Sequence, residues 1–277
     1  MRAHVVAWLA QWLPLDVARL IAPTWYTMVG IAGLLTLVVL LRHARRDGID
    51  RAAVATAVIV SYVAAIVGGI AMPALLAMAE AALDGRAVRP RFVGMTSYWG
   101  YLAGTIAMVE ACRRGAVPLG WLADRATAVL GVALALVRTG CFLAGCDYGK
   151  LTSGPWAVRF PRGAPAWRDH VERGLVPVTR DASLPVHPTQ LYEAAVGVVI
   201  AIAAALWCRS RARVGTGRVF LAAVAAYCAA RLGVEALRGD RLRGFLGPMS
   251  SGQVFALMVL AAIAAAVAWS RRPAPGA

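Results

Sequence analysis

Long apolar runs constrain the fold of this chain more than any other feature of its sequence. A helix needs about 20 predominantly apolar residues to cross the hydrocarbon core of a bilayer. Only 16% of the residues are charged, whereas a soluble domain carries about a quarter. We predict an all-α polytopic membrane protein with one domain over residues 1–277, embedded in a lipid bilayer. We expect seven spanning helices, placed at about 24–42, 53–80, 95–112, 118–143, 188–208, 217–237 and 251–270.

The arginines gather in alternate loops between these apolar runs. They are Arg42, Arg45, Arg46, Arg51, Arg113, Arg114, Arg125, Arg209, Arg211, Arg213, Arg218, Arg271 and Arg272. Cytoplasmic loops are enriched in Lys and Arg, so this pattern predicts an N-terminus outside and a C-terminus in the cytoplasm. The net charge of +15 is therefore a topology signal. No basic tail or aromatic RNA-binding motif accompanies the charge, and we expect no nucleic-acid partner.

Two segments lie outside the predicted spans. Residues 1–22 are expected to form an amphipathic helix in the membrane interface rather than a signal peptide, because no clear small-residue cleavage site follows. Residues 146–187 form a long polar loop on the outer side, between the fourth and fifth spans. Loops of this length usually carry function or are disordered. We expect Trp156, Phe160 and Trp167 to pack this loop onto the membrane surface.

Two arginines, Arg138 and Arg231, fall within or at the end of apolar helices. A charge at membrane depth costs several kcal/mol unless it has a partner. On the sixth predicted helix, Tyr227, Arg231, Glu235 and Arg238 share one face, because their spacing keeps them within about 80° of arc. Glu235 there serves two arginines, and a phosphodiester would balance the excess positive charge. The alternative is an ion pair that only locks helices together.

The segment 138–150 combines an arginine with three glycines, Gly140, Gly145 and Gly149. Glycine lets the backbone approach a ligand closely, and backbone N–H groups could then face a headgroup or an oxyanion. Close helix packing through small residues is the alternative interpretation.

A second polar cluster opens the fifth predicted helix. Pro188 suits the first turn of a helix, which places His187 at or near its N-cap in the interface. Gln190 and Glu193 are three residues apart and share a face. His187 is a catalytic candidate here, although a structural histidine is an equally good reading.

The chain has five cysteines, of which only Cys141 and Cys146 are close in sequence. An odd number scattered over helices is not a disulfide framework. A four-ligand metal site would need further Cys or His nearby, so we predict no metal site. The alternative is a redox function for this pair, which an oxidising compartment would permit.

Taken in order, these clusters resemble the prolipoprotein diacylglyceryl transferase family. The most specific motifs are Arg138-x-Gly140 through Gly149, the run from His187 to Glu193, and Tyr227-x3-Arg231-x3-Glu235-x2-Arg238-x-Asp240. Members of this family are seven-helix enzymes of the bacterial inner membrane. They move a diacylglyceryl group from phosphatidylglycerol to the lipobox cysteine of a preprolipoprotein and release glycerol phosphate. We expect the same reaction and partners here, without a cofactor.

The resemblance also implies roles for individual residues. Arg138 and Arg231 match essential arginines that bind the headgroup and stabilise the leaving phosphate, and we add His187 to this catalytic set. Tyr26 and Tyr227 match tyrosines that line the same cavity. The substrate-binding residues that we predict are Tyr26, Gly140, Cys141, Gly145, Cys146, Gly149, Gln190, Tyr192, Glu193, Tyr227, Glu235 and Arg238.

Three positions depart from the family pattern. Cys141 replaces an asparagine, Cys146 replaces a glutamate, and Trp99 replaces a histidine proposed to activate the thiol. Tryptophan cannot accept a proton, but a free cysteine is already a few per cent thiolate at neutral pH. These departures leave two alternatives open. The chain could be a paralogous transferase that uses an anionic phospholipid with another acceptor, or a non-catalytic lipid-binding or transport protein.

Overall fold

The computed structural model describes residues 25–85, 97–209, 214–240 and 245–270, together with the single positions Val5 and Gln11. The interfacial helix predicted over residues 1–22 falls almost entirely outside these residues and stays a prediction. The chain divides into two compact units. The first unit comprises Met1–Ala32, Thr127–Arg211 and Arg218–Ala277, and the second comprises Gly33–Ala126 and Ala212–Gly217.

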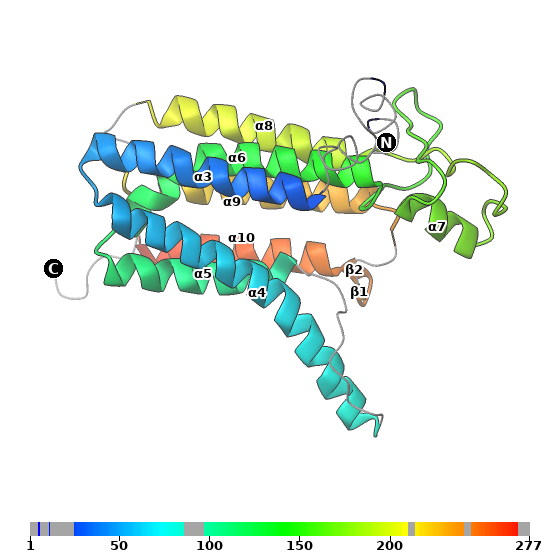
Figure 1. The fold of residues 1–277 in the computed structure, drawn as a ribbon, viewed down its shortest axis with the longest axis horizontal. Coiled ribbons are helices and arrows are strands. Elements are labelled where there is room, and N and C mark those ends of the chain that lie inside the picture. Colours follow the sequence, from blue (N-terminus) through cyan, green and yellow to red (C-terminus); the bar gives the residue numbers. More distant parts are fainter. Residues whose placement is uncertain are drawn as a thin grey trace. The chain divides into compact units, whose positions relative to one another are not determined.

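Helices dominate the described structure (Figure 1). They are α3 (Trp25–Asp47), α4 (Arg51–Leu83), α5 (Ser97–Arg114), α6 (Leu119–Ala144), α7 (Pro165–Glu172), α8 (Thr189–Trp207), α9 (Arg218–Leu237) and α10 (Ser251–Ser270). A short antiparallel pair, β1 (Phe245–Leu246) with β2 (Met249–Ser250), precedes α10. Each predicted span falls on one of these helices. Helix α7 and the β1–β2 pair were not anticipated from the sequence.

Six of the described helices are long and apolar enough to cross a membrane, namely α3, α4, α6, α8, α9 and α10. Helix α5 is regular over its 18 residues but is not among the six. Its last turns carry the charges of Glu110, Arg113 and Arg114. A multi-pass, all-helical membrane protein is therefore confirmed, whereas a seventh span through α5 stays a prediction.

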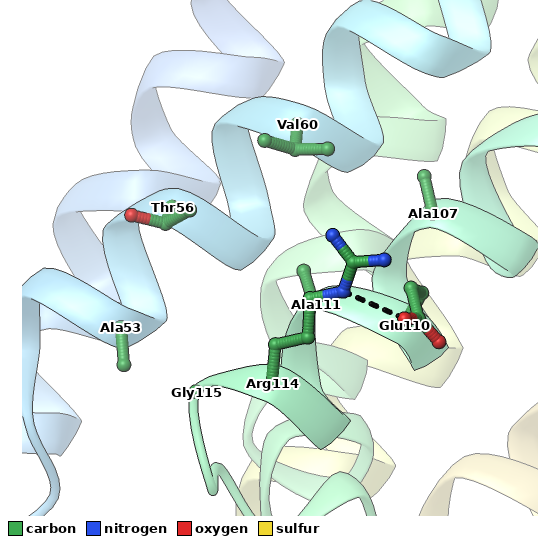
Figure 2. Close-up of a pocket in the computed structure, with 8 residues that line it drawn as sticks. All are labelled: Ala53, Thr56, Val60, Ala107, Glu110, Ala111, Arg114 and Gly115. Atoms are coloured by element: carbon green, nitrogen blue, oxygen red, sulfur yellow. Dashed lines mark hydrogen bonds and ion pairs between the residues drawn. The ribbon is translucent and has the colours of Figure 1, made fainter.

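In the second unit, α4 packs closely along α5 because glycines face the contact. A Cβ atom at Gly100 would stand 2.9 Å from the carbonyl oxygen of Ala65, and one at Gly68 would stand 2.5 Å from the Cβ of Ala103. Membrane helices gain van der Waals contact by such close approach. A cavity of about 390 Å³ between the two helices is lined by Ala53, Thr56, Val60, Ala107, Glu110, Ala111, Arg114 and Gly115 (Figure 2).

Two carboxylates, those of Asp47 and Asp124, tie the second unit together. Arg125 donates from Nε and Nη2 to Oδ2 of Asp47 at 2.9 and 2.7 Å, and Trp121 Nε1 donates to the same oxygen at 2.9 Å. Asp124 accepts hydrogen bonds from the backbone N–H groups of Gly215 and Gly217, both at 2.9 Å. These carboxylates satisfy buried donors and hold the ends of helices in place.

In the first unit, α9 packs against both α8 and α10. Helix α6 meets α8 at two glycines, which bring the helices into backbone contact. A Cβ atom at Gly131 would lie 2.6 Å from the carbonyl oxygen of Gly197, and one at Gly197 would lie 2.7 Å from the carbonyl oxygen of Gly131. This close approach brings the polar residues of α6 and α8 within reach of each other.

The segment between α6 and α8 is folded, with α7 inside it. Phe160 is completely buried in a small core with Tyr148, Ala166 and Val186. Trp167 is buried and donates from Nε1 to the carbonyl oxygen of Arg180 at 2.7 Å. The prediction that Phe160 and Trp167 pack onto the membrane surface is therefore wrong, because the segment has enough apolar residues to build its own core.

Candidate functional site

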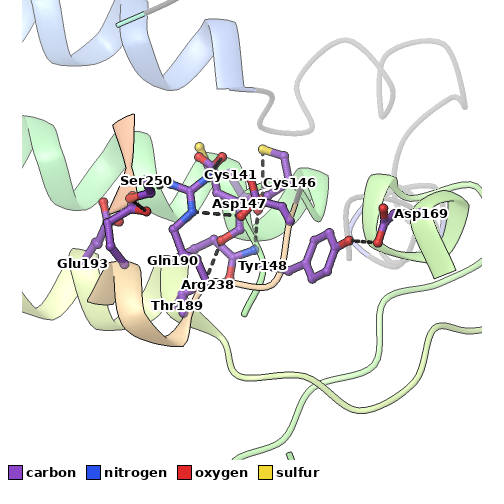
Figure 3. A network of polar contacts seen from close by, with 12 residues as sticks. Cys141, Cys146, Asp147, Tyr148, Asp169, Thr189, Gln190, Glu193, Arg238 and Ser250 are labelled. Carbon is purple, nitrogen blue, oxygen red and sulfur yellow. Dashed lines mark hydrogen bonds and ion pairs between the residues drawn. The ribbon is translucent and has the colours of Figure 1, made fainter. Parts of the chain in front are cut away.

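Three arginines and three carboxylates of the first unit form a closed ring of alternating charge. In order around the ring, they are Arg138, Glu193, Arg231, Glu235, Arg238 and Asp147. We call these six residues the charge ring. Every carboxylate of the ring bridges two arginines, and every arginine contacts two carboxylates of the ring. Figure 3 shows Glu193, Arg238 and Asp147 within the polar network around this ring.

Glu193 on α8 joins three helices. One carboxylate oxygen contacts Nε of Arg138 on α6, and the other contacts Nη1 of Arg231 on α9. The Glu193 side chain is 3% exposed, and the two arginine side chains are each 12% exposed. A carboxylate buried to this degree requires charged partners, because an unpaired charge in such surroundings would cost several kcal/mol.

Asp147 lies just after α6 and is the most exposed member of the ring, at 31% of its side chain. Its two oxygens contact Nη1 of Arg138 and Nη2 of Arg238, each at 2.8 Å. Burial alone would raise the pKa of Asp147, but Arg238 and Arg138 outweigh it and hold the pKa below its ordinary value. Asp147 is therefore ionised at neutral pH.

Glu235 is almost fully buried at the end of α9. It contacts Nη2 of Arg231 at 2.6 Å and Nη1 of Arg238 at 3.5 Å. The hydroxyl of Ser250 donates to its second oxygen at 2.8 Å. Gly252 makes room for the carboxylate, because a Cβ atom there would lie 2.6 Å from Oε1. The predicted i,i+4 pair of Arg231 with Glu235 is thus present in the structure.

The charge balance differs from the one inferred from the sequence. Asp240 adds a fourth carboxylate, which accepts from Arg238 at 2.9 and 2.7 Å. Four carboxylates therefore face three guanidinium groups. The expected excess of positive charge is wrong for the described residues, because Glu193 and Asp147 reach the arginines from other elements.

The glycine-containing turn after α6 is held by its own backbone. Gly145 has φ +82°, the left-handed conformation that commonly ends a helix. The N–H groups of Gly145 and Cys146 both donate to the carbonyl of Cys141, at 2.8 and 3.3 Å, and Gly149 N–H donates to the carbonyl of His187 at 2.9 Å. The prediction that these amides face an oxyanion is not met, since each amide is already bonded.

Gly149 is required for close packing. A Cβ atom at this position would stand 2.5 Å from the Cβ of His187 and 3.0 Å from the carbonyl oxygen of Leu237. Lys150 N–H donates to that same carbonyl at 2.7 Å, and Gly239 N–H donates to the carbonyl of Tyr148 at 3.0 Å. The turn is therefore joined directly to the end of α9, which Arg238 follows.

The first residues of α8 hold this turn from the other side. Thr189 donates from Oγ1 to the carbonyl of Asp147 at 2.7 Å, and Gln190 donates from Nε2 to the carbonyl of Cys146. Gln190 is 1% exposed, and within the described parts of the chain its Oε1 has no hydrogen-bond partner. A buried acceptor without a partner costs about 1–3 kcal/mol, so it marks a place where a ligand donor would fit.

Two other residues predicted for the site, His187 and Tyr227, are not members of the charge ring. His187 precedes the N-cap, which is Pro188, and its Nδ1 lies 3.0 Å from the Tyr192 hydroxyl and accepts from Trp156 Nε1 at 3.3 Å. Its side chain therefore bonds to Tyr192 and Trp156. Tyr227 is close enough to interact electrostatically with the ring's Arg138 and Arg231.

Gly140 is buried in the last turns of α6, where Cys141 is also buried. Tyr26 belongs to α3, but its side chain lies outside the described part of the structure. The sulfurs of Cys141 and Cys146 and a carboxylate oxygen of Asp147 lie within 4.8 Å of one another, a spacing that a metal ion could bridge.

Sequence reasoning missed the parts played by Asp147, Asp240, Thr189 and Ser250. A signal was available for Ser250, because Ser250 to Gln253 matches the capping-box pattern that begins a helix. In the structure, Gln253 N–H donates to the Ser250 hydroxyl at 3.2 Å, and Ser250 N–H donates to Gln253 Oε1 at 3.0 Å. No comparable local pattern connects Thr189 with Asp147, which are 42 residues apart.

Six apolar helices and a buried ring of arginines and carboxylates define a multi-pass membrane protein with a charged site among its helices. Charged groups within spanning segments are rare, and they generally serve function. A family profile described as prolipoprotein diacylglyceryl transferase matches residues 17–269. The chain therefore belongs to the prolipoprotein diacylglyceryl transferase family.

Individual relatives agree with this assignment. The chain is 33% identical over 178 residues to the phosphatidylglycerol–prolipoprotein diacylglyceryl transferase of Rhodococcus jostii, covering 61% of this chain and 48% of the relative. It is 32% identical over 191 residues to transferase 2 of Streptomyces coelicolor, covering 68% and 56%. The Rhizobium meliloti enzyme is 34% identical over 169 residues, covering 59% and 54%. The chain thus spans about half the length of these curated relatives.

Proposed function

We propose that this chain transfers the diacylglyceryl group of phosphatidylglycerol to the lipobox cysteine thiol of a preprolipoprotein, as a step of lipoprotein biosynthesis. Membership of the family and the printed names of the relatives support this activity. The structural observation that carries it is the convergence of Arg138 and Arg231 on Glu193. Two guanidinium groups held so close together are suited to one phosphodiester.

In this proposal the lipid phosphate replaces Asp147 on Arg138. Asp147 is the most exposed carboxylate of the ring, at 31%, whereas Glu193 and Glu235 are 3% and 1% exposed. With four carboxylates around three arginines, an added anion must displace one of them. Asp147 keeps its contact with Arg238 when it leaves Arg138, so the exchange leaves no carboxylate unpaired.

The glycerol headgroup supplies a donor for the unpaired acceptor. Gln190 Oε1 is buried and lacks a partner among the described side chains and backbone. A headgroup hydroxyl would satisfy it, which would favour phosphatidylglycerol over a lipid without hydroxyl groups. A site built to hydrogen-bond a hydroxyl discriminates strongly against analogues that lack it.

The chemical step is a displacement at carbon. The acceptor thiolate attacks the glycerol carbon of the diacylglyceryl group, a C–S bond forms, and the C–O bond to phosphate breaks with its electrons on oxygen. Arg138 and Arg231 stabilise the charge that grows on the leaving glycerol phosphate. The thiol proton passes to solvent, because Trp99 provides no base at the position where the family has histidine. We keep His187 in the proposal only as a residue that positions Tyr192.

We also propose the finer topology. Helix α5 supplies the seventh span, the N-terminus is outside, and the C-terminus is cytoplasmic in a bacterial inner membrane. The alternating arginine-rich loops support this orientation. Residues 146–187 then lie on the periplasmic side as one domain with the helices, and residues 1–22 lie in the interface.

The test uses purified protein, labelled phosphatidylglycerol and a lipobox peptide, scored for a thioether-linked product by mass spectrometry. We expect product from the unaltered chain and none from Arg231→Ala. Arg114→Ala is the matched control, because Arg114 forms an exposed pair with Glu110 and is 80% exposed. Lipid binding without product from any lipobox peptide would contradict the proposal.

The same experiment separates two other functions. Cys141, Cys146 and Trp99 depart from the family pattern and favour a paralogue with another acceptor. Release of glycerol phosphate without transfer to the peptide would point to that paralogue. Lipid binding with no glycerol phosphate release would point to a non-catalytic lipid-binding protein.

A further inference from the structure

The end of α6 brings two thiols together. The N–H groups of Gly145 and Cys146 both donate to the carbonyl of Cys141, at 2.8 and 3.3 Å, and Gly145 has φ +82°. The hydrogen bond from the Cys146 N–H to the Cys141 carbonyl spans six residues, as in a Schellman motif. In that motif the side chains at these two positions commonly contact each other. Here both contacting positions are cysteines, with their sulfurs within 4.8 Å.

The turn is already fixed in this conformation by its neighbours. Gln190 donates to the carbonyl of Cys146, and Thr189 donates to the carbonyl of Asp147 at 2.7 Å. Ala166 N–H donates to the carbonyl of Gly145 at 3.2 Å. These hydrogen bonds hold the two cysteines near each other, with their sulfurs within 4.8 Å.

The surroundings favour oxidation over metal binding. The third possible ligand, Asp147, uses both carboxylate oxygens for Arg138 and Arg238, each at 2.8 Å. A cation bound by Asp147 would displace one guanidinium group and then face it at short range. Disulfide exchange needs access to one thiol, since a thiolate attacks the incoming disulfide, and Cys146 is partly exposed. Figure 3 shows Cys141 and Cys146 beside Asp147.

We propose that Cys141 and Cys146 are a redox-active dithiol that forms a reversible disulfide by exchange with small-molecule disulfides. Cys146 is the attacking thiol, because it is partly exposed whereas Cys141 is buried. Its thiolate attacks one sulfur of the small disulfide, forms a mixed disulfide and expels one thiolate. Cys141 then loses its proton, attacks the Cys146 sulfur and expels the second thiolate. The two protein thiols are oxidised, and the small disulfide is reduced to two thiols.

The remaining cysteines provide internal controls. Cys112 and Cys228 are buried on α5 and α9, and Cys208 is partly exposed at the end of α8. Cys208 is the matched control for exposure, because it has access to solvent like Cys146. We expect Cys208 to form at most a mixed disulfide under the same conditions.

The experiment equilibrates the full chain in detergent with a series of ratios of oxidised to reduced glutathione. Free thiols are then blocked with an alkylating reagent, and the peptides are weighed. We expect one midpoint at which the peptide containing Cys141 and Cys146 changes from two alkyl groups to none and weighs two hydrogens less than the free dithiol peptide. In Cys141→Ser, oxidising glutathione ratios should instead leave a bound glutathione on Cys146, since no neighbouring protein thiol remains to expel it.

Three outcomes would overturn the proposal. The first is alkylation of both thiols at every glutathione ratio. The second is a glutathione adduct on Cys146 in the unaltered chain that never resolves. The third is stoichiometric zinc binding that requires both thiols and protects them from oxidised glutathione, which would show a metal site. The measurement reads sulfur chemistry alone, so it does not depend on transfer activity.

Discussion

The two units each bury an arginine against carboxylate, but they do so differently. In the second unit, Arg125 gives two hydrogen bonds to one oxygen of Asp47, and the side chains are 9% and 13% exposed. In the first unit, Arg138 and Arg231 each contact two carboxylates, and each of those carboxylates contacts a second arginine. Among the described residues, Arg125 contacts one carboxylate, whereas each carboxylate of the charge ring is shared between two arginines.

The difference indicates at which of the two sites an arginine can exchange a carboxylate for another anion. Removing Asp47 from Arg125 would leave an isolated buried charge, so this pair acts as a lock between helices. In the charge ring, Asp147 can leave Arg138 while it still contacts Arg238, and Arg138 still contacts Glu193. A shared network therefore tolerates replacement of one carboxylate by a phosphate.

The largest expected effect compares arginine with lysine in the two regions. Arg231→Lys should reduce diacylglyceryl transfer by roughly 100–1,000-fold, because lysine cannot keep two contacts in the geometry of a guanidinium group. Arg125→Lys should lower the thermal midpoint and leave the rate per folded molecule nearly unchanged. For each variant, product formation measures the transfer rate and thermal unfolding measures the midpoint. Equal loss of transfer in the two variants would contradict the distinction between the structural pair of Arg125 with Asp47 and the functional charge ring.

The second comparison removes a bridging carboxylate from each region. Asp47→Asn should destabilise the protein by about 3–5 kcal/mol, because it leaves the buried Arg125 guanidinium group without its anion. Glu193→Gln should cost less, because Arg138 still contacts Asp147 and Arg231 still contacts Glu235. Addition of phosphatidylglycerol vesicles should restore much of the thermal midpoint of Glu193→Gln, since phosphate can take the vacated place. Asp47→Asn should show no such recovery. Recovery of both variants would show that the lipid acts generally on stability.

The third change, Asp147→Asn, should have a smaller effect of about 1 kcal/mol on stability, because the side chain is partly solvated. It should lower the KM for phosphatidylglycerol by freeing Arg138. The pKa of Asp147 is held below its ordinary value by Arg238 and Arg138 despite burial. The stability that ionised Asp147 adds to the folded protein is therefore complete above the ordinary aspartate pKa, near 3.8. This stability is lost as the pH falls through the lowered pKa of the folded state.

Thermal midpoints of the unaltered chain and Asp147→Asn, measured across acidic pH, check this assignment. The two curves should be parallel above about pH 5 and should converge as Asp147 takes up its proton below its ordinary pKa. A constant difference down to the lowest pH would mean that the carboxylate charge contributes nothing to the ring.

The smallest effect is expected at the exposed pair of Glu110 with Arg114, whose side chains are 49% and 80% exposed. Glu110→Gln should change stability by less than about 0.5 kcal/mol, because solvent screens the pair. Chemical denaturation measures the change, and transfer should be unaffected. A loss of transfer would give the adjacent cavity between α4 and α5 a role that the proposal does not assign.

Local patterns predicted the helices and one contact of the ring. The apolar runs placed each helix within a few residues, because a membrane span must satisfy its backbone internally. The pair of Arg231 with Glu235 followed from i,i+4 spacing, and it is present at 2.6 Å. The sequence motifs also indicated the family, and the profile match over residues 17–269 confirms the family.

The sequence alone determined that this chain is an apolar helical protein with arginines inside its helices, because helix periodicity and hydropathy are local properties. Only the tertiary structure decided which carboxylates meet those arginines. Glu193 reaches Arg138 and Arg231 because Gly131 and Gly197 let α6 and α8 touch, and because α9 packs on α8. The balance of charge at the site therefore depends on contacts between residues far apart in the chain, which no local spacing encodes.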